Sequence, residues 1–349
     1  MNSRLFTSRF LAGLIGLLVI FPVGGQAQER RQGRMEVIDL PAPTVSITVE
    51  GDTRVIRANG LPNHETGSFP NLSNPNAIRP QSHEIRLPLN PEAAKRFTPA
   101  RPEFGIGING VIFDAGTGEF WSADGQRRGP GRGNAEGGER SRPPRGERPP
   151  RGERPDGPPR GRRGEGRGPS GGGGGAWNYD PKADGTVPLG LDDNHAHVQP
   201  TGKYHYHGVP TGLLESLGQH QHGDHVHVDK MLLIGWAYDG FPIYGPYGYK
   251  DPGDLNSELV ELKPSYRLKS GTRPASPQGP GGKYDGTFSN DWEYARGLGD
   301  LDEANGRYGV TPEFPEGTYY YVVTDAFPSI PRYWRGTSAV RRGGGGPRR

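Results

Sequence analysis

Short segments in which apolar and polar residues alternate recur along the chain. Residues 45–49, with the sequence VSITV, alternate cleanly, and residues 83–87 do so again. Because successive side chains of a strand point to opposite faces of a sheet, this period of two predicts β-strands with one buried face. Alternation or short apolar runs predict further strands at 105–113, 204–207, 226–238, 266–268 and 318–324.

Glycine and proline interrupt these segments at short intervals, with 58 Gly and 36 Pro in 349 residues. Both residues favour turns and oppose long helices, so only two short helices are predicted. One spans 91–96, with Asn90 as its N-cap and Pro91 as its first residue, and the other spans 291–296 after Asn290. Strands and helices do not alternate in the βαβ manner. We therefore predict an all-β fold, a sandwich or barrel with few short helices.

The composition changes abruptly between Trp121 and Trp177. This segment consists mostly of Gly, Arg, Pro and acidic residues, and it repeats RPPRGE at 142–147 and 148–153. It has almost no apolar side chain to bury, so residues 126–175 are predicted to be a long disordered insertion. An insertion into a surface loop of one domain costs little loop-closure entropy. A linker between two domains is the alternative.

The N-terminus has the three parts of a secretory signal peptide. Arg4 and Arg9 are basic, residues 10–23 are an apolar run, and residues 25–27 offer small side chains for cleavage. The apolar run is short for a membrane span, so we expect a secreted or periplasmic protein without a transmembrane anchor, and a retained N-terminal anchor is the alternative. The predicted segments are the signal peptide (1–27), a flexible N-terminal segment (28–40), one β-rich domain (41–125 and 176–338), the insertion (126–175) and a basic tail (339–349).

The net charge of +3 is a sum of unlike parts. The insertion carries +7, the signal peptide +2 and the tail +4, which leaves −10 for the rest of the chain. The basic pI therefore does not indicate a nucleic-acid-binding domain, and no specific nucleic-acid partner is expected. The Arg-Gly insertion is either a soluble spacer or an arm that binds envelope polyanions or glycans. The absence of cysteine excludes disulfides, thiolate-bound metals and cysteine nucleophiles.

Eight of the ten histidines fall between residues 195 and 227. Six of them form three His-x-His pairs, and a strand would place both imidazoles of a pair on one face. Two paired strands can then bring four imidazoles to one ion, and imidazole binds zinc, copper and iron. A solvated loop or histidines hydrogen-bonded in a β core are the alternatives, and the first applies best to QHQH at 219–222. The candidate ligands are His195, His197, His205, His207, His225 and His227.

Asp239 comes directly after a short apolar run and precedes Gly240. At a strand end beside the histidines it would bind the metal, orient a ligand or act as a general base. The alternative is that it stabilises its own turn, as Asp before Gly often does. Tyr204 and Tyr206 are expected on the face opposite His205 and His207, and therefore in the core.

Several of these motifs resemble the YHYH domain family. The resemblance rests on YHYH at 204–207, on HAHVQPTG at 195–202 and on DGFPIYG at 239–245, and it extends over most of the chain outside the insertion. It implies an exported domain whose activity is not established. Tyr320 departs from a GTYHY-like pattern in which relatives often carry His, so a ligand set taken over from them would be one residue short.

The function that these features favour is that of an exported metal-binding domain, and its enzymatic version would be metal-dependent hydrolysis of cell-envelope or extracellular material. Three histidines and an open position would let a divalent metal, zinc or alternatively copper or iron, activate water, with Asp239 as the catalytic base. Four histidines would instead form a closed, structural site. No HExxH or Walker motif is present. The alternative is a non-enzymatic secreted module that binds envelope polymers through the aromatic residues at 241–249 and 319–321 and through the Arg-Gly insertion. The sequence leaves open whether the protein is an enzyme.

Overall fold

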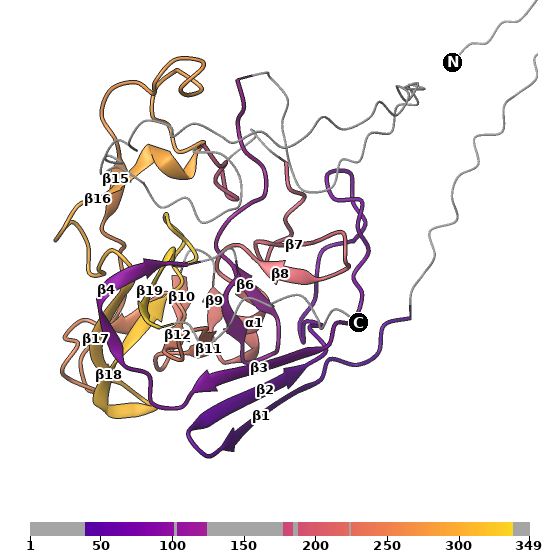
Figure 1. Ribbon diagram of the computed structural model, residues 1–349. Coiled ribbons are helices and arrows are strands. Elements are labelled where there is room, and N and C mark those ends of the chain that lie inside the picture. Colours follow the sequence, from indigo (N-terminus) through magenta and orange to yellow (C-terminus); the bar gives the residue numbers. More distant parts are fainter. Residues whose placement is uncertain (1–38, 101–102, 124–176, 184–187, 223–224, 338–349) are drawn as a thin grey trace, which may run out of the picture. The chain divides into compact units, whose positions relative to one another are not determined.

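The computed structural model describes residues 39–100, 103–123, 177–183, 188–222 and 225–337 (Figure 1). The described residues from Leu40 onward belong to one compact unit. The predicted signal peptide, the insertion at 126–175 and the tail at 339–349 lie outside the described residues. Within the described part of the chain, no helix is long and apolar enough to cross a membrane.

The largest sheet has eight strands in the order β17-β18-β12-β11-β5-β6-β8-β7. Most neighbours are antiparallel, but β6 pairs with β8 and β12 with β18 in parallel. Strands from both sides of residues 124–176 therefore lie in one sheet. Its strands are β5 (Glu103–Gly107), β6 (Ile112–Asp114), β7 (Ala196–Val198), β8 (Tyr204–Tyr206), β11 (Leu233–Ala237), β12 (Pro242–Tyr244), β17 (Gly306–Thr311) and β18 (Phe314–Val322).

A three-stranded antiparallel sheet precedes it in the chain and consists of β1 (Val45–Glu50), β2 (Thr53–Ala58) and β3 (His83–Pro88). Two-stranded pairs complete the described fold. They are β4 (Ala93–Pro99) with β19 (Tyr333–Gly336), β9 (His220–His222) with β10 (His225–His227), β13 (Tyr247–Tyr249) with β14 (Leu259–Glu261), and β15 (Tyr266–Leu268) with β16 (Trp292–Tyr294).

The all-β prediction is confirmed, since the described helices are only α1 (Thr211–Ser216) and the 3-10 turn η1 (Ser289–Asp291). The strands predicted at 45–49, 83–87, 204–207, 266–268 and 318–324 are also present. Two long predicted strands are divided. Residues 105–113 turn at Asn109-Gly110, where Gly110 has a φ of +84°, as an Asn-Gly pair between apolar segments favours. Residues 226–238 form β10 and β11 with an interval between them.

Both predicted helices are wrong. Residues 91–96 lie partly in β4, where Thr98 pairs with Trp334 of β19, so a partner from the far end of the chain overrides the local capping signal. Of residues 291–296, Asp291 ends η1 and Trp292–Tyr294 form β16. Asp291 is fully buried and accepts a hydrogen bond from Arg273 Nε at 2.8 Å. This buried ion pair is a tertiary contact that the local sequence does not report.

Tyrosine fills much of the core. Six tyrosines are less than 2 % exposed, and each keeps a hydroxyl that must find a polar partner. Tyr244, for example, donates to Glu313 Oε2 at 2.6 Å, and Tyr319 donates to Asp302 at 3.0 Å. The buried tyrosine rings therefore pack together with specific hydrogen bonds, which fix the positions of their strands relative to neighbouring segments. The six are Tyr204, Tyr206, Tyr244, Tyr319, Tyr320 and Tyr321.

Candidate metal centre

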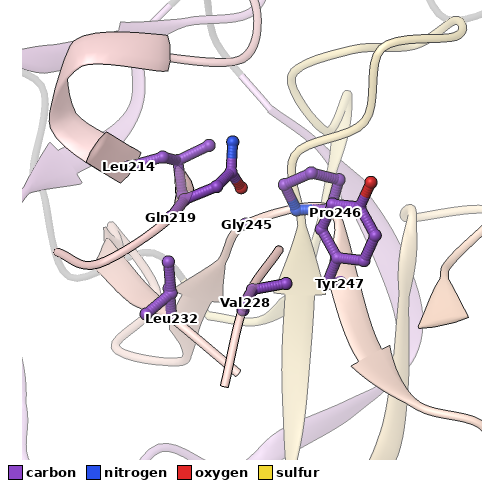
Figure 2. A pocket seen from close by; sticks show the side chains of 7 residues that line it. All are labelled: Leu214, Gln219, Val228, Leu232, Gly245, Pro246 and Tyr247. Atoms are coloured by element: carbon purple, nitrogen blue, oxygen red, sulfur yellow. The ribbon is translucent and has the colours of Figure 1, made fainter. Parts of the chain in front are cut away.

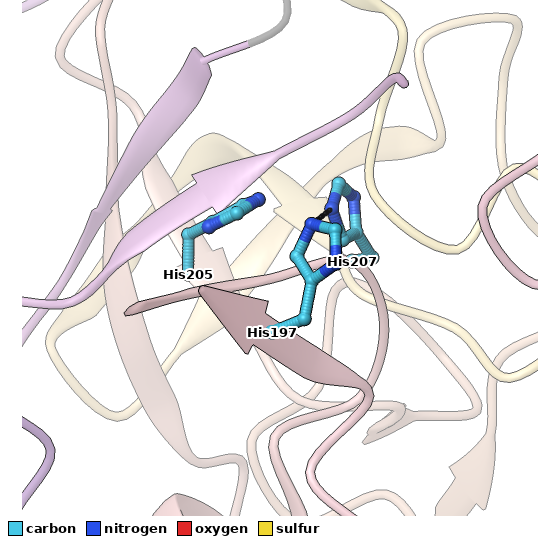
Figure 3. Close-up of side chains that lie close together, drawn as sticks. All are labelled: His197, His205 and His207. Atoms are coloured by element: carbon cyan, nitrogen blue, oxygen red, sulfur yellow. Dashed lines mark hydrogen bonds between the residues drawn. The ribbon is translucent and has the colours of Figure 1, made fainter. Parts of the chain in front are cut away.

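β7 and β8 bring three histidines together. The turn between them closes through Gly202, whose N–H donates to Gln199 O at 2.8 Å and whose φ is +85°. The resulting register sets His197 directly opposite His205. His207 follows two residues after His205 and joins the same group, as strand alternation predicts. Figure 3 shows the three rings turned toward one another.

The three rings are almost equally spaced. Their centroids lie 4.6–4.8 Å apart, and one nitrogen from each ring lies within 4.8 Å of the other two. The Nε2 atoms of His197 and His207 are 3.1 Å apart. Two nitrogens bound at about 2.0–2.1 Å to a tetrahedral zinc ion would be roughly 3.3 Å apart. The separation of the His197 and His207 nitrogens therefore matches one edge of such a coordination sphere, and a nitrogen of His205 lies within 4.8 Å of both.

Backbone carbonyls hold the opposite nitrogen of every ring. His197 Nδ1 lies 2.9 Å from Leu189 O, His205 Nδ1 lies 3.2 Å from Lys203 O, and His207 Nδ1 lies 3.0 Å from Asp114 O. A carbonyl oxygen can only accept, so each Nδ1 carries the proton and donates it. In the neutral imidazole the Nε2 atom is then left with its lone pair. This is the arrangement by which proteins orient histidines for metal binding.

Burial keeps these imidazoles neutral. His205 and His207 are 1 % and 3 % exposed, and burial together with the neighbouring histidines lowers the pKa of both well below its usual value. Burial also lowers the pKa of His197, although Glu119 and Asp192 act in the opposite direction. A proton shared between His197 and His207 is thus disfavoured, and their two lone pairs face each other across 3.1 Å. A cation bound between the two Nε2 atoms would remove this repulsion.

Charged residues lie close to the backbone groups that orient the triad. Lys203 forms an ion pair with Glu103, and Lys203 also supplies the carbonyl that orients His205. Asp114, whose carbonyl orients His207, has a carboxyl group whose burial raises its pKa to about 7. The site is therefore built from buried polar groups with specific partners. Among the described residues, the group of metal-binding side chains contains only the three histidines.

The two tyrosines of the YHYH sequence lie on the other face of β8, as predicted. Tyr204 donates to Asp192 Oδ2 at 2.7 Å, and Tyr206 shares a 2.6 Å hydrogen bond with His64 Nε2. Asn109 Nδ2 also donates to the Tyr206 hydroxyl at 2.9 Å. Both rings are fully buried. The tyrosines anchor β8 in the core, and His205 and His207, which alternate with them, face the site.

His195 lies outside the triad. Its φ of +51° breaks the strand before β7 begins, so it does not share a face with His197. Its Nδ1 donates to Val209 O at 2.9 Å. The turn that imposes this conformation is held by Asp192, whose Oδ1 accepts from the backbone N–H groups of Asn194 and Ala196. The sequence offered no sign of the positive φ.

The third histidine pair is also outside the triad. His225 and His227 belong to β10, which pairs with β9 instead of β7 or β8. The side chain of His227 is exposed and lies 3.0 Å from Asp229 Oδ1. Residues 219–222 were predicted as a loop, but 220–222 form β9, in which His220 is exposed.

Asp239 is committed to a structural network. Its Oδ2 accepts from Tyr321 Oη at 2.5 Å and from Gly336 N at 2.8 Å, while Oδ1 accepts from Phe241 N at 3.3 Å. Burial raises its pKa, and these hydrogen bonds oppose the shift. It is not part of the histidine group. A small hollow near the end of α1 contains none of the three histidines (Figure 2); it is lined by Leu214, Gln219, Val228, Leu232, Gly245, Pro246 and Tyr247.

Sequence reasoning missed the groups that orient the triad. The carbonyls of Leu189 and Asp114 belong to residues distant from the histidines, and only the parallel pairing of β6 with β8 brings Asp114 to His207. Glu119, which acts electrostatically on His197, lies on the loop after β6. Because backbone carbonyls have no residue signature, no pattern in the sequence could have identified them.

A family model described as YHYH protein matches residues 84–336, which is more than half of the chain. The matched range contains all three histidines of the triad and Asp239. No curated protein matches the chain. No solved structure matches it either.

Proposed function

Because the chain belongs to the YHYH protein family and brings three imidazoles to one point, we propose that it is an exported metal-binding protein that acts as a hydrolase. His197, His205 and His207 are the ligands in this proposal, each through Nε2. The substrate is cell-envelope or extracellular material. His195, His225, His227 and Asp239, which the sequence suggested as site residues, are not included in the ligand set.

One observation carries the proposal. All three Nδ1 atoms are engaged by backbone carbonyls, so three Nε2 lone pairs converge in a buried space without a donor among them. His64, a histidine outside the group, instead pairs its Nε2 with the Tyr206 hydroxyl. Burying three acceptors together is costly unless a cation compensates.

The donor set favours a borderline transition metal. Three neutral imidazoles suit zinc, copper or iron better than calcium or magnesium, which prefer oxygen. Zinc is our first choice, because three protein ligands and one exchangeable position are its usual arrangement in hydrolytic sites. Copper and iron are the alternatives, and metal analysis separates them.

Hydrolysis requires a bound water and a nearby base. A zinc ion held by the three histidines would bind the water and lower the pKa of that water to about 7. For the second we propose Glu119 in place of Asp239. Glu119 is half-buried and close enough to His197, the most exposed ligand, to act on its pKa, whereas both oxygens of Asp239 already accept hydrogen bonds.

The loops that border the insertion suggest which substrates reach the site. Trp121 N donates to Trp177 O at 2.9 Å, and Phe120 and Asn178 form a β-bridge. The loop before the insertion carries Glu119 and follows directly from Asp114, which orients His207. The arginine-rich segment thus starts close in sequence to residues of the candidate centre. We propose that it recruits anionic envelope polymers.

The alternative of an aromatic polymer-binding module is weaker. The residues expected to form its surface are mostly internal: Phe241 and Tyr249 are 3 % and 8 % exposed, and Tyr319–Tyr321 are at most 1 % exposed. Buried rings cannot stack on a ligand. The surface that this hypothesis needs is therefore missing from the described residues.

The first experiment is metal analysis of protein purified without a histidine tag. We expect about one zinc ion per chain, lost in His205→Ala and retained in His220→Ala. Zinc-dependent cleavage is then sought with a panel of phosphoester, peptide and polysaccharide substrates. Protein that takes up no transition metal under replete conditions refutes the metal centre, and bound metal without any turnover refutes only the hydrolase. Glu119→Gln should retain the metal and lose turnover.

A further inference from the structure

The outer strand of the three-stranded sheet has an open edge. β1 occupies one end of the order β1-β2-β3 in the described part of the chain, and all six of its residues are exposed (Figure 1). Proteins usually protect such an edge with proline, lysine or a β-bulge. β1 has no proline and no lysine, and it pairs with β2 from Val45↔Ala58 to Glu50↔Thr53 without a register shift.

An apolar row runs along this strand. Val45, Ile47 and Val49 are 42 %, 41 % and 59 % exposed. They lie on the same face of the sheet as Ile56 and Leu87, which are 0 % and 1 % exposed and belong to the main core. The core-facing side of the sheet therefore continues past the core and ends in a row of half-exposed aliphatic side chains. Such a row on an open edge favours pairing with another strand.

We propose that β1 pairs with β1 of a second copy of this chain, antiparallel and centred on Ile47. The strand is self-complementary in this register. Ile47 faces its own copy, Val45 faces Val49 of the partner, and Ser46 faces Thr48 of the partner. Apolar side chains thus meet on one face and hydroxyl side chains meet on the other, the cross-strand pairs that stabilise sheets.

The charges select the antiparallel orientation. Glu50 is the only charged residue of β1, and it already pairs with Arg86 at 2.6 Å and with Arg57 at 3.5 Å in its own sheet. Antiparallel pairing places the two Glu50 side chains at opposite ends of the interface. A parallel in-register pair would set them side by side, where like charges repel.

The pairing joins two sheets into one of six strands around a two-fold axis. A two-fold interface uses the same surface on both copies and closes the assembly at two, so it leaves no open β1 edge. It involves no residue of the histidine site. The dimer therefore stands or falls independently of the proposed function.

The oligomeric state tests the interface. By sedimentation velocity over a concentration series, the full chain should form a reversible dimer. Ile47→Lys should be monomeric with an unchanged thermal midpoint, because Ile47 is 41 % exposed and a lysine there is the kind of edge protection that β1 lacks. Leu268→Lys, which changes a 38 % exposed strand residue elsewhere, should still dimerise. A chain that stays monomeric, or a dimer that survives Ile47→Lys, overturns the proposal.

Cysteine cross-linking tests the register, since the native chain has no cysteine. In the proposed pairing the two residues at position 47 are directly opposite, with Cα atoms about 4.5–5.5 Å apart, within reach of a disulfide. The two residues at position 48 are about 8 Å apart, which is beyond that reach. Mild oxidation should therefore cross-link Ile47→Cys and leave Thr48→Cys unlinked. Preferential linkage of Thr48→Cys, or of neither variant, overturns the register.

Discussion

The hydroxyl of Tyr321 donates a hydrogen bond of 2.5 Å to Asp239 Oδ2, and this contact joins the turn between β11 and β12 to β18. The Tyr321 hydroxyl in turn accepts from the backbone N–H of Arg335 at 2.6 Å, and Asp239 accepts from Gly336 N. A single buried carboxylate thus ties together three segments that are up to 97 residues apart in the chain. These hydrogen bonds give the Asp before Gly240 a structural role in the described fold.

Replacing Asp239 should destabilise the fold and leave metal binding intact. Asp239→Ala removes the acceptor for Tyr321, Gly336 and Phe241, and each buried donor left unpaired costs about 1–3 kcal/mol. We expect the free energy of unfolding in urea to fall by roughly 3–5 kcal/mol. The folded fraction should still bind one metal ion. An Asp239→Ala protein of native stability that has lost turnover would instead indicate a catalytic Asp239.

Removing one ligand should abolish the stabilisation that the metal provides. An ion that binds only the folded chain stabilises it by about 2.7 kcal/mol when its free concentration is 100 times its Kd. His197→Ala, His205→Ala and His207→Ala should each lose this gain, as measured by thermal unfolding with and without zinc. The exposed His220 and His227 serve as controls, and their alanine variants should respond to zinc like the native chain. Equal responses in all five variants would mean that the triad does not bind metal.

The sequence predicted the strands of this protein better than its site. A period of two depends only on burial of one face, which is a local property, and it located β1, β3 and β8. It also placed His205 and His207 on one face and Tyr204 and Tyr206 on the other. It failed for 91–96, where a distant strand supplies the pairing that local signals cannot report.

Because local sequence does not report turn geometry, it also predicts His195 and His197 as an equivalent pair. Only three-dimensional structure shows that the Asp192 turn gives His195 a positive φ and separates the two rings. Equally, β10 finds its partner in the neighbouring β9, which keeps His227 away from β7 and β8. Residue types indicated a metal centre, but strand register and turn geometry decide which histidines form it.

Deleting residues 126–175 should leave the domain intact. The segments on either side hold each other directly, through Trp121 N to Trp177 O at 2.9 Å and Tyr179 N to Glu119 O at 3.1 Å. A short connection can therefore replace the deleted residues, and loop-closure entropy changes little with length. We expect the thermal midpoint to change by no more than about one or two degrees. Binding to anionic polymers should be lost and, in the native chain, should weaken with salt. A large fall in the midpoint would show that the segment packs on the domain.

Metal release should occur at lower pH than for free imidazole. A metal and a proton compete for each Nε2, and the pKa values of His205 and His207 lie well below the usual value of 6.5 because the rings are buried beside one another. Protons therefore displace the metal only at a pH well below 6.5, and zinc should remain bound at pH 6.5. The folding stability of the metal-free protein should also fall as the pH decreases below 6.5. Between these lowered pKa values and pH 6.5 the unfolded chain binds more protons than the folded chain, so folding stability falls as the pH decreases, by up to about 1.4 kcal/mol per pH unit for each histidine. A pH series of bound zinc and of urea unfolding measures both effects. Zinc release with a midpoint at or above pH 6.5, or an unfolding free energy of the metal-free protein that is unchanged below it, would mean that the triad is solvated and does not form a buried site.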